Sequence, residues 1–217
     1  MKYTHLRLSL NKGGRDYIIS DLHGCYKEFQ KKLVEIGFNK KTDRMFSVGD
    51  LNDRGEDSVS CLNLIKEPWF YSVLGNHETM LLDAYYQKGN YYTKYNNSRN
   101  GGDWFYEISD ETQKELVDLI ETLPLSITIG KNKIGICHAE PPSNDWEDRF
   151  NDEFAATKLL WGRDWIKNES TIVNNIEHTY HGHTPVKEPI TIGNSTFIDT
   201  GAVFKGGKLT CLELNYD

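Results

Sequence analysis

Short apolar runs alternate with amphipathic segments through the first half of the chain. The runs 17–20, 44–48 and 69–74 are rich in β-branched and aromatic residues, which predicts three buried strands. A polar turn and then a segment of helical spacing follow each run. In the first of these segments, 26–36, apolar residues recur every three or four positions up to Gly37, which predicts the helix end.

The pattern changes after a fourth helical segment. This helix is expected to begin with Asp110 as its N-cap, with Gln113 three residues later, and to stop at Pro124. A short helical stretch is expected to end in the sequence LLWGRDW, 159–165. Apolar runs predict further strands at 125–130, 133–140, 189–193, 195–199 and 208–214.

Two polar stretches, 88–103 and 141–152, interrupt this pattern and are expected to be long surface loops. The order βαβαβα followed by mostly strands predicts an α/β protein with two packed mixed β-sheets flanked by helices. A chain of 217 residues is expected to form one domain, 1–217.

Composition excludes several classes of protein. The chain has 25 Lys and Arg against 32 Asp and Glu, a net charge of −7, which argues against nucleic acid as a main partner. Neither a membrane-length apolar run nor a signal-like apolar segment is seen, so no membrane partner and a cytoplasmic location are expected. The four cysteines form no CxxC pair, which favours reduced thiols over a zinc ribbon or disulfide framework.

Metal-binding residue types follow the predicted strands directly. They are Asp21, His23, Asp50, Asp53, Asn76, His77 and His138. Because ligands bind at the carboxyl ends of strands in α/β sheets, we expect these side chains to converge on one edge. Oxygen and nitrogen donors together suit Mn, Fe or Zn. Two such ions held about 3.5–4 Å apart can activate water and stabilise an in-line displacement at phosphorus.

Each motif alone has a plainer interpretation. Asp21 could cap a turn beside a surface His23, Asn76 could be a helix N-cap with Glu78 favoured by the helix dipole, and HGHTP at 181–185 could be a simple turn. Their joint occurrence at strand ends favours the metal site.

Five sequence blocks in this order resemble the signature of the calcineurin-like metallophosphoesterases, in their phosphoprotein phosphatase branch. The blocks are DLHG at 21–24, GDLNDRG at 49–55, GNHE at 75–78, HAE at 138–140 and HGHTP at 181–185. The short chain and LWGRD at 160–164 are similar to the bacteriophage lambda type of Ser/Thr phosphatase. The resemblance, over 16–214, implies the α/β/β/α sandwich of that family.

The resemblance also implies a site. Six residues would hold two divalent ions, Mn first with Fe or Zn as alternatives: Asp21 and His23 on one, Asn76, His138 and His183 on the other, and Asp50 bridging. His181 is the weaker candidate of its pair. Arg54 and Arg163 would bind phosphate oxygens, His77 would protonate the leaving alkoxide, and Asp53 would orient His77.

The implied activity is a metal-dependent phosphomonoesterase acting on phosphoserine and phosphothreonine, and by extension phosphotyrosine, in proteins or peptides. A hydroxide bridging the ions would attack directly, without a phosphoenzyme. The alternative is a symmetrical diadenosine tetraphosphatase or other nucleotide phosphoanhydride hydrolase. A catalytically silent metal-binding scaffold is a remote third alternative. Such a protein would be expected to have lost a metal ligand, Arg54 or His77, and this sequence retains them all.

Three positions depart from the family pattern: Ser20 for glycine, Asn52 for an apolar residue in GDLNDRG, and Glu140 at a variable position. A tyrosine cluster is a further open feature, either the wall of a substrate groove or, as we favour, the aromatic anchor of a loop. Its members are Tyr85, Tyr86, Tyr91, Tyr92 and Tyr95.

Overall fold

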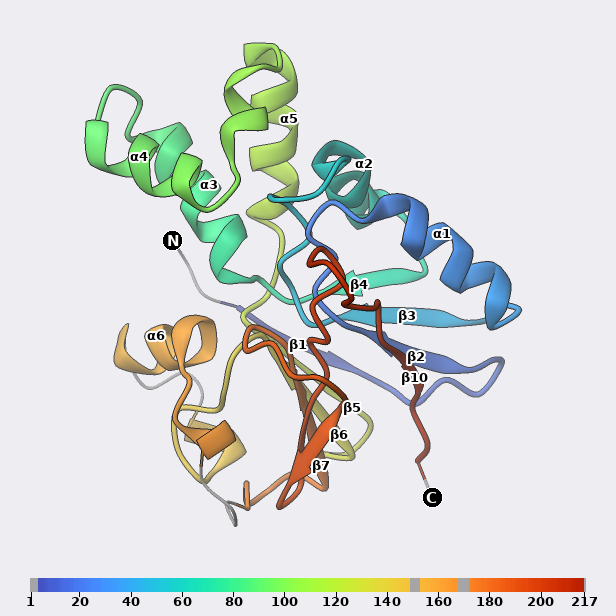
Figure 1. The fold of residues 1–217 in the computed structure, drawn as a ribbon. Helices are drawn as coiled ribbons and strands as arrows, with labels where there is room; N and C mark the ends of the chain where they lie inside the picture. The colour runs from blue at the N-terminus through green and yellow to red at the C-terminus, as the bar shows by residue number, and fades with distance from the viewer. Residues whose placement is uncertain (1–3, 149–152, 168–171, 217) are drawn as a thin grey trace.

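A computed structural model describes residues 4–148, 153–167 and 172–216, and Figure 1 shows two β-sheets with helices around them. One sheet has the strand order β1-β5-β6-β7-β9-β8 and the other β10-β2-β3-β4. The strands are β1 (His5–Leu8), β2 (Asp16–Ile19), β3 (Arg44–Ser47), β4 (Phe70–Ser72), β5 (Ser126–Ile129), β6 (Ile134–Cys137), β7 (His178–His181), β8 (Ile190–Ile192), β9 (Ser195–Phe197) and β10 (Cys211–Glu213). The α-helices are α1 (Tyr26–Glu35), α2 (Ser58–Asn63), α3 (Asn76–Tyr86), α4 (Tyr91–Arg99), α5 (Asp110–Ile120) and α6 (Glu153–Trp161).

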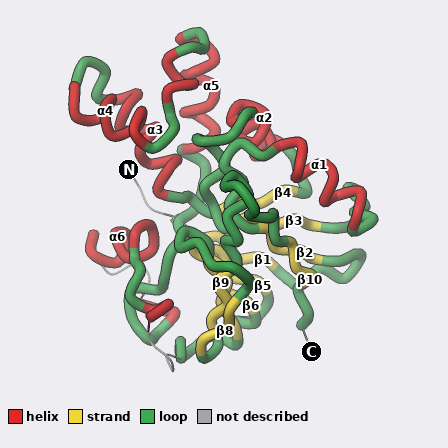
Figure 2. The backbone as a smooth tube through the Cα atoms, in the orientation of Figure 1, coloured by secondary structure: helices red, strands yellow, loops and turns green. Residues whose placement is uncertain are grey.

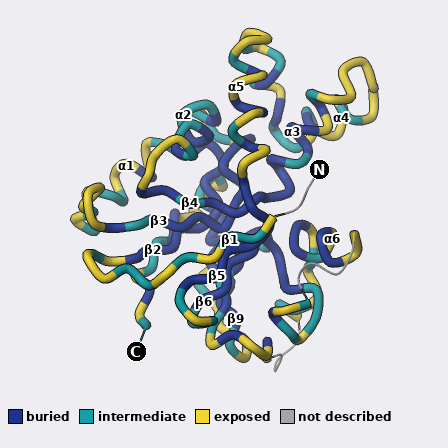
Figure 3. The backbone as a smooth tube through the Cα atoms, turned by 180° about the vertical axis from the view of Figure 1, so that it is seen from behind, coloured by how far each residue is buried: buried dark blue, intermediate teal, exposed yellow. Residues whose placement is uncertain are grey.

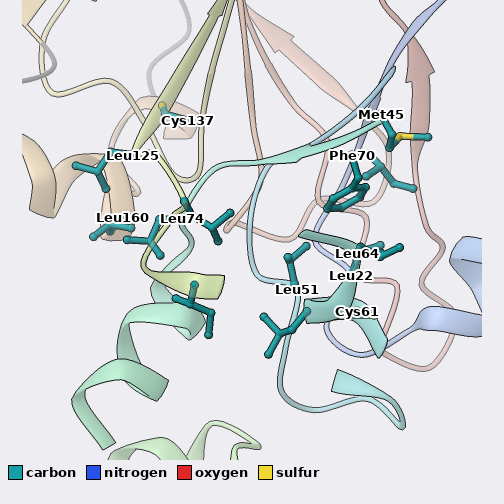
Figure 4. Packing of buried hydrophobic residues seen from close by; sticks show 14 of the residues in the cluster. Leu22, Met45, Leu51, Cys61, Leu64, Phe70, Leu74, Leu125, Cys137 and Leu160 are labelled. Atoms are coloured by element: carbon teal, nitrogen blue, oxygen red, sulfur yellow. The ribbon is translucent and has the colours of Figure 1, made fainter. Parts of the chain in front are cut away.

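The alternation of side chains along β2 and β3 separates two hydrophobic cores. Ile18 and Phe46 join isoleucines of β5 and β6 in the core between the sheets. Their neighbours Tyr17, Ile19 and Met45 face the opposite way, into a larger core that includes residues of α1 and α2. Figure 4 shows part of this larger core, with Leu22, Leu51 and Phe70 labelled among its side chains.

The helices form the outer layers. In Figures 1 and 2, α1 and α2 cover the four-stranded sheet, and α6 lies beside the six-stranded sheet. Figure 3 shows buried strands in the interior and exposed outer turns on the helices. This arrangement confirms the predicted α/β fold of two packed mixed sheets flanked by helices. Among the described residues, no helix combines the length and the apolar character needed to span a bilayer.

Strands β1 and β7 were not anticipated by the sequence pattern. Each is four residues long and carries polar side chains, so neither is a conspicuous apolar run. Pairing with neighbouring strands stabilises both: β1 pairs with β5, and β7 lies between β6 and β9 in the six-stranded sheet.

The prediction that 88–103 is a loop was wrong, because α4 occupies most of it. The Asn90 side chain caps α4 by accepting a hydrogen bond from Tyr92 N (3.0 Å), and the buried Asn97 donates to Gly102 O (3.3 Å). Polar contacts therefore stabilise this helix. Its sequence has no apolar stripe from which a helix could be predicted.

The predicted aromatic anchor was wrong for most of the tyrosine cluster. Tyr85 packs against the larger core. The remaining four side chains are exposed: Tyr86, Tyr91, Tyr92 and Tyr95. The presence of aromatic residues does not show which face of a helix packs against the rest of the protein. Here no neighbouring element of the described structure covers these four side chains.

Two smaller expectations also needed correction. The N-cap of α5 is Ser109, one residue earlier than predicted, and its Oγ accepts from Thr112 N (3.1 Å). The stretch 141–152 was predicted to be a surface loop, but Trp146 is fully buried and donates through Nε1 to Thr128 Oγ1 (2.8 Å). Gly135 on β6 leaves the space that its indole ring fills. Residues 149–152 lie outside the described ranges.

Candidate metal centre

The carboxyl ends of five strands meet at one place and supply the predicted metal ligands. Strands β2, β3 and β4 run parallel in one sheet, and β6 and β7 run parallel in the other. The segments that follow parallel strands lie at the same edge of their sheet. These segments carry all six predicted ligands, and each of the six is buried. The sequence prediction that they converge is borne out for the groups around Asp50, described next.

Asp50 lies between two groups of possible ligands. Its Oδ2 is 3.6 Å from His23 Nε2, and its Oδ1 is 3.3 Å from His138 Nε2. His138 Nε2 and His183 Nδ1 in turn lie 2.8 Å and 2.9 Å from Asn76 Oδ1. A carboxylate with one oxygen toward each group has the geometry of a bridging ligand.

The surroundings of these side chains fit divalent ions. The Nδ1 atoms of His23 and His138 bond to the backbone oxygens of Asn52 (2.9 Å) and Val48 (2.7 Å), which turns each Nε2 toward the centre. Asp21 Oδ1 and His183 Nε2 are buried and make no hydrogen bond within the described protein. Unpaired buried acceptors are costly, and divalent ions bound at the centre would satisfy them.

The electrostatics of the site also favour positive charge. Burial lowers the pKa of His23 and of His183 to about 3, which leaves both imidazoles neutral and able to bind metal. Burial opposes charge on His138 too, but the Asp50 carboxylate outweighs it and raises the pKa of His138 to about 9. Burial disfavours charge on Asp50 as well, but the neighbouring imidazoles, above all those of His138 and His77, outweigh it and hold the pKa of Asp50 well below its ordinary range.

The loops that carry the site are conformationally unusual. Among the described residues, seven non-glycine residues have positive φ, and five of them are predicted site residues. The five are His23, Asp50, Asp53, Arg54 and His183. Such backbone conformations are costly and persist where the surrounding structure imposes them, often at functional sites.

The predicted acid pair is in contact. His77 Nδ1 donates to Asp53 Oδ2 at 2.6 Å, and His77 Nε2 lies 4.0 Å from Asp50 Oδ2, so this imidazole faces the metal centre. The other Asp53 oxygen accepts from Trp104 Nε1 (2.9 Å) and Asn52 Nδ2 (2.8 Å). The Asn52 departure therefore adds a donor to the Asp53 carboxylate.

The two arginines approach the centre from different elements. Arg54 Nη1 donates to His23 Nε2 at 2.7 Å. Arg163 is exposed, and its charge contributes to lowering the pKa of His183, although burial has the larger effect. His181 does not join the cluster, because its Nε2 bonds to Thr179 Oγ1 (2.8 Å) and its Nδ1 lies 3.3 Å from Cys137 Sγ.

Two of the plainer interpretations do not hold, whereas Glu78 does lie in the first turn of α3. His23 is buried rather than at the surface, and Gly75, not Asn76, occupies the N-cap position of α3. The sequence analysis missed the role of Glu78, whose carboxylate accepts from the backbone N–H groups of Asp50 (3.0 Å), Leu51 (2.7 Å) and Gly75 (2.8 Å). Its place in GNHE was the available signal.

Two other side chains near the centre were also missed. Trp104 contacts Asp53, as described above, and its only signal was its position after the NGGD segment. Asp199, at the end of β9, is buried, and burial together with the nearby Asp50 raises its pKa. It places a further carboxyl group near Asp21 and Asp50.

The fold and this centre define a metallophosphoesterase. A family model for calcineurin-like phosphoesterases matches residues 16–210, and the chain belongs to this family, which depends on a dinuclear metal site. The chain is 37% identical over 199 residues to serine/threonine-protein phosphatase 1 of Salmonella typhimurium, a match that covers 89% of each protein. It is 30% identical to an asymmetrical bis(5'-nucleosyl)-tetraphosphatase of Oceanobacillus iheyensis, covering 89% of this chain and 86% of that protein.

Solved structures show the same fold. A serine/threonine phosphatase from Saccharomyces cerevisiae superposes with a TM-score of 0.65 at 16% identity, covering 97% of this chain and 83% of that one. At this identity the likeness concerns the fold alone.

Replacing Asn76 by alanine is expected to weaken one of two metal sites and leave the other. Asn76 Oδ1 is the point on which His138 and His183 converge, whereas His23 lies across Asp50. Calorimetric titration of the metal-free protein with Mn²⁺ measures both sites. Asn63→Ala, which removes a side chain bonded to Val59 O on α2, is the control. Two ions bound to Asn76→Ala with unchanged affinity would contradict the assignment.

Proposed function

We propose that this protein is a metal-dependent phosphatase that hydrolyses phosphoserine and phosphothreonine in proteins. The observation that carries the proposal is the Asp53–His77 pair (2.6 Å), whose imidazole faces the metal centre. The alkoxide that leaves a phosphoserine needs a proton in the transition state, and a positioned imidazole can supply it. A phosphate leaving group, with a pKa of about 6, needs it far less.

Each predicted site residue has a part in this proposal. The six ligands Asp21, His23, Asp50, Asn76, His138 and His183 would hold two divalent ions, with Mn²⁺ as the proposed metal. Such ions lower the pKa of water to give a nucleophile and offset charge on the phosphoryl oxygens. Arg54 and Arg163 would each offer a planar guanidinium to those oxygens.

The leaving-group side of the site depends on Asp53. Its carboxylate accepts hydrogen bonds from three side chains, those of His77, Asn52 and Trp104. These contacts fix the imidazole plane and keep its Nδ1 proton toward Asp53, so that Nε2 faces the substrate. We propose that Asp53 acts through His77 and does not contact the substrate.

Hydrolysis of a dinucleoside tetraphosphate is the second candidate. The tetraphosphatase relative favours it, and that relative is of the asymmetrical type rather than the symmetrical type considered from the sequence. Similarity to the bacterial protein phosphatase is higher, at 37% against 30% identity over a comparable share of the chain. A silent scaffold is disfavoured because the ligand groups and the acid pair are assembled.

One experiment separates these functions. The protein is stripped of metal with a chelator, reloaded with Mn²⁺, Fe²⁺ or Zn²⁺, and assayed for kcat/KM on a phosphoserine peptide and on diadenosine tetraphosphate. A preference for the peptide is expected. Preference for the dinucleotide would move the proposal to the second candidate, and its products, two ADP or ATP with AMP, would give the cleavage type. Activity on neither would overturn both.

A further inference from the structure

Glu140 connects the metal-binding end of β6 to the loop that follows α6. Its side chain is fully buried two residues after His138. One oxygen, Oε2, accepts hydrogen bonds from the backbone N–H groups of Asp164 (2.7 Å) and Trp165 (2.8 Å). The other, Oε1, accepts from Lys158 Nζ (3.1 Å). One oxygen of this buried carboxylate therefore holds a short stretch of backbone, and the other bonds to a lysine of α6.

The loop is shaped to receive this carboxylate. A Cβ atom at Gly162 would lie 2.2 Å from Glu140 Cγ, so the glutamate side chain packs directly against the glycine. Lys158 compensates the buried charge and also bonds to Asp164 Oδ2 (2.5 Å). The backbone from Gly162 to Trp165 is thus fixed from the protein interior.

This stretch carries Arg163 beside the metal centre. The ring of Trp161, just before it, lies 6.2 Å from the ring of His183, and the charge of Arg163 acts on His183. Arg163 is itself exposed, so packing around its side chain contributes little to its direction. Its backbone position, set by Glu140, decides where the guanidinium can reach.

We propose that Glu140 is a positioning residue that directs Arg163 toward phosphate bound at the metal centre. The proposal rests on the proposed function only in that Arg163 binds a phosphoryl group there. Glu140 would not touch the phosphate. It would act by reducing the conformations open to the Arg163 backbone, and displacement of a binding group by about 1 Å can cost a hundredfold in rate.

The test compares Glu140→Ala with Glu140→Gln in the Mn²⁺-loaded protein. The alanine variant leaves the N–H groups of Asp164 and Trp165 without their acceptor, and kcat/KM is expected to fall about tenfold to a hundredfold. The glutamine oxygen can still accept from Asp164 and Trp165, so most of the activity should return. Calorimetric titration with inorganic phosphate gives a second readout, in which its affinity should fall in Glu140→Ala and recover in Glu140→Gln.

A double-mutant cycle with Arg163→Ala shows whether Glu140 acts through Arg163. In the Arg163→Ala background, Glu140→Ala is expected to change kcat/KM and phosphate affinity by less than about twofold. Losses that multiply in the double variant would overturn the inference, as would unchanged phosphate affinity in Glu140→Ala. If Glu140→Ala does not fold, Gly162→Ala tests the same contact, because its methyl group would push the loop away from Glu140.

Two controls distinguish the role of Glu140 from a general effect of substitution and from the role of Arg163 itself. Asp118→Asn removes an exposed carboxylate that bonds to Lys114 on α5, away from the loop after α6, and should leave phosphate affinity unchanged. Arg163→Ala alone measures the phosphate contact. If it has no effect, the role of Arg163 fails and the inference with it. If Arg163→Ala weakens phosphate while both Glu140 variants do not, only the inference fails.

Discussion

Replacing His77 by asparagine is expected to lower kcat on a phosphoserine peptide by at least about a hundredfold. The imidazole faces the metal centre and bonds to Asp53 through Nδ1, the geometry of a proton donor to the leaving group. The loss should be much smaller on p-nitrophenyl phosphate, whose phenolate leaves with little need of a proton. Steady-state kinetics on the two substrates, with metal content checked for each variant, measure the difference.

The control for this prediction is another histidine in the same protein. His178→Asn alters a partly buried imidazole on β7 that bonds to Thr196, away from the metal cluster, and should leave both rates near wild type. Equal losses on the two substrates in His77→Asn would contradict the role of general acid. They would point instead to a role of His77 in holding the centre together.

Replacing Asp50 by asparagine is expected to weaken metal binding more than replacing Asn76 by alanine does. Asp50 carries the negative charge between the two groups of histidines, so the neutral amide should weaken both metal sites. Loss of a residue that only supports a ligand costs about tenfold to a hundredfold in metal affinity, and a bridging ligand should exceed this. Activity should fall below detection at Mn²⁺ concentrations that saturate the wild type.

Calorimetric titration with Mn²⁺ distinguishes this variant from Asn76→Ala, which should lose one site only. The fold should survive, because an asparagine oxygen can still accept from His77 N, as Asp50 Oδ1 does (3.0 Å). Asp43→Asn is the matched control, a buried carboxylate that bonds to Arg15 and Asn39 outside the centre. Tight binding of two ions by Asp50→Asn would show that Asp50 does not bridge them.

Much of the centre was predictable because its chemistry is local. Asp21, Asp50 and His138 each lie within three positions of a strand end, and parallel strands bring such positions to one edge whatever the rest of the fold does. The residue types themselves indicate which ions the site suits. That the chain forms one domain over all of 1–217 stays a prediction.

The features that could not be predicted from the sequence depend on which helix faces and strands pack against one another in the folded protein. The tyrosine cluster of α3 and α4 was predicted to anchor a loop, but only packing decides whether an aromatic side chain is covered, and here four of the five are exposed. The short strand β7 is specified mainly by the neighbours on either side of it.

The sequence by itself predicted the two-sheet class of fold and the metal-binding residue types at the strand ends, because strand ends and side-chain chemistry are properties of short segments. The roles of His77 and Asp53 were implied by the family resemblance and stay predictions. Only the tertiary structure decided what Trp104, Glu78 and Glu140 do. Trp104 contacts a carboxylate 51 positions away. The two glutamates bond mainly to backbone N–H groups, which every residue except proline has, so no sequence pattern marks their partners.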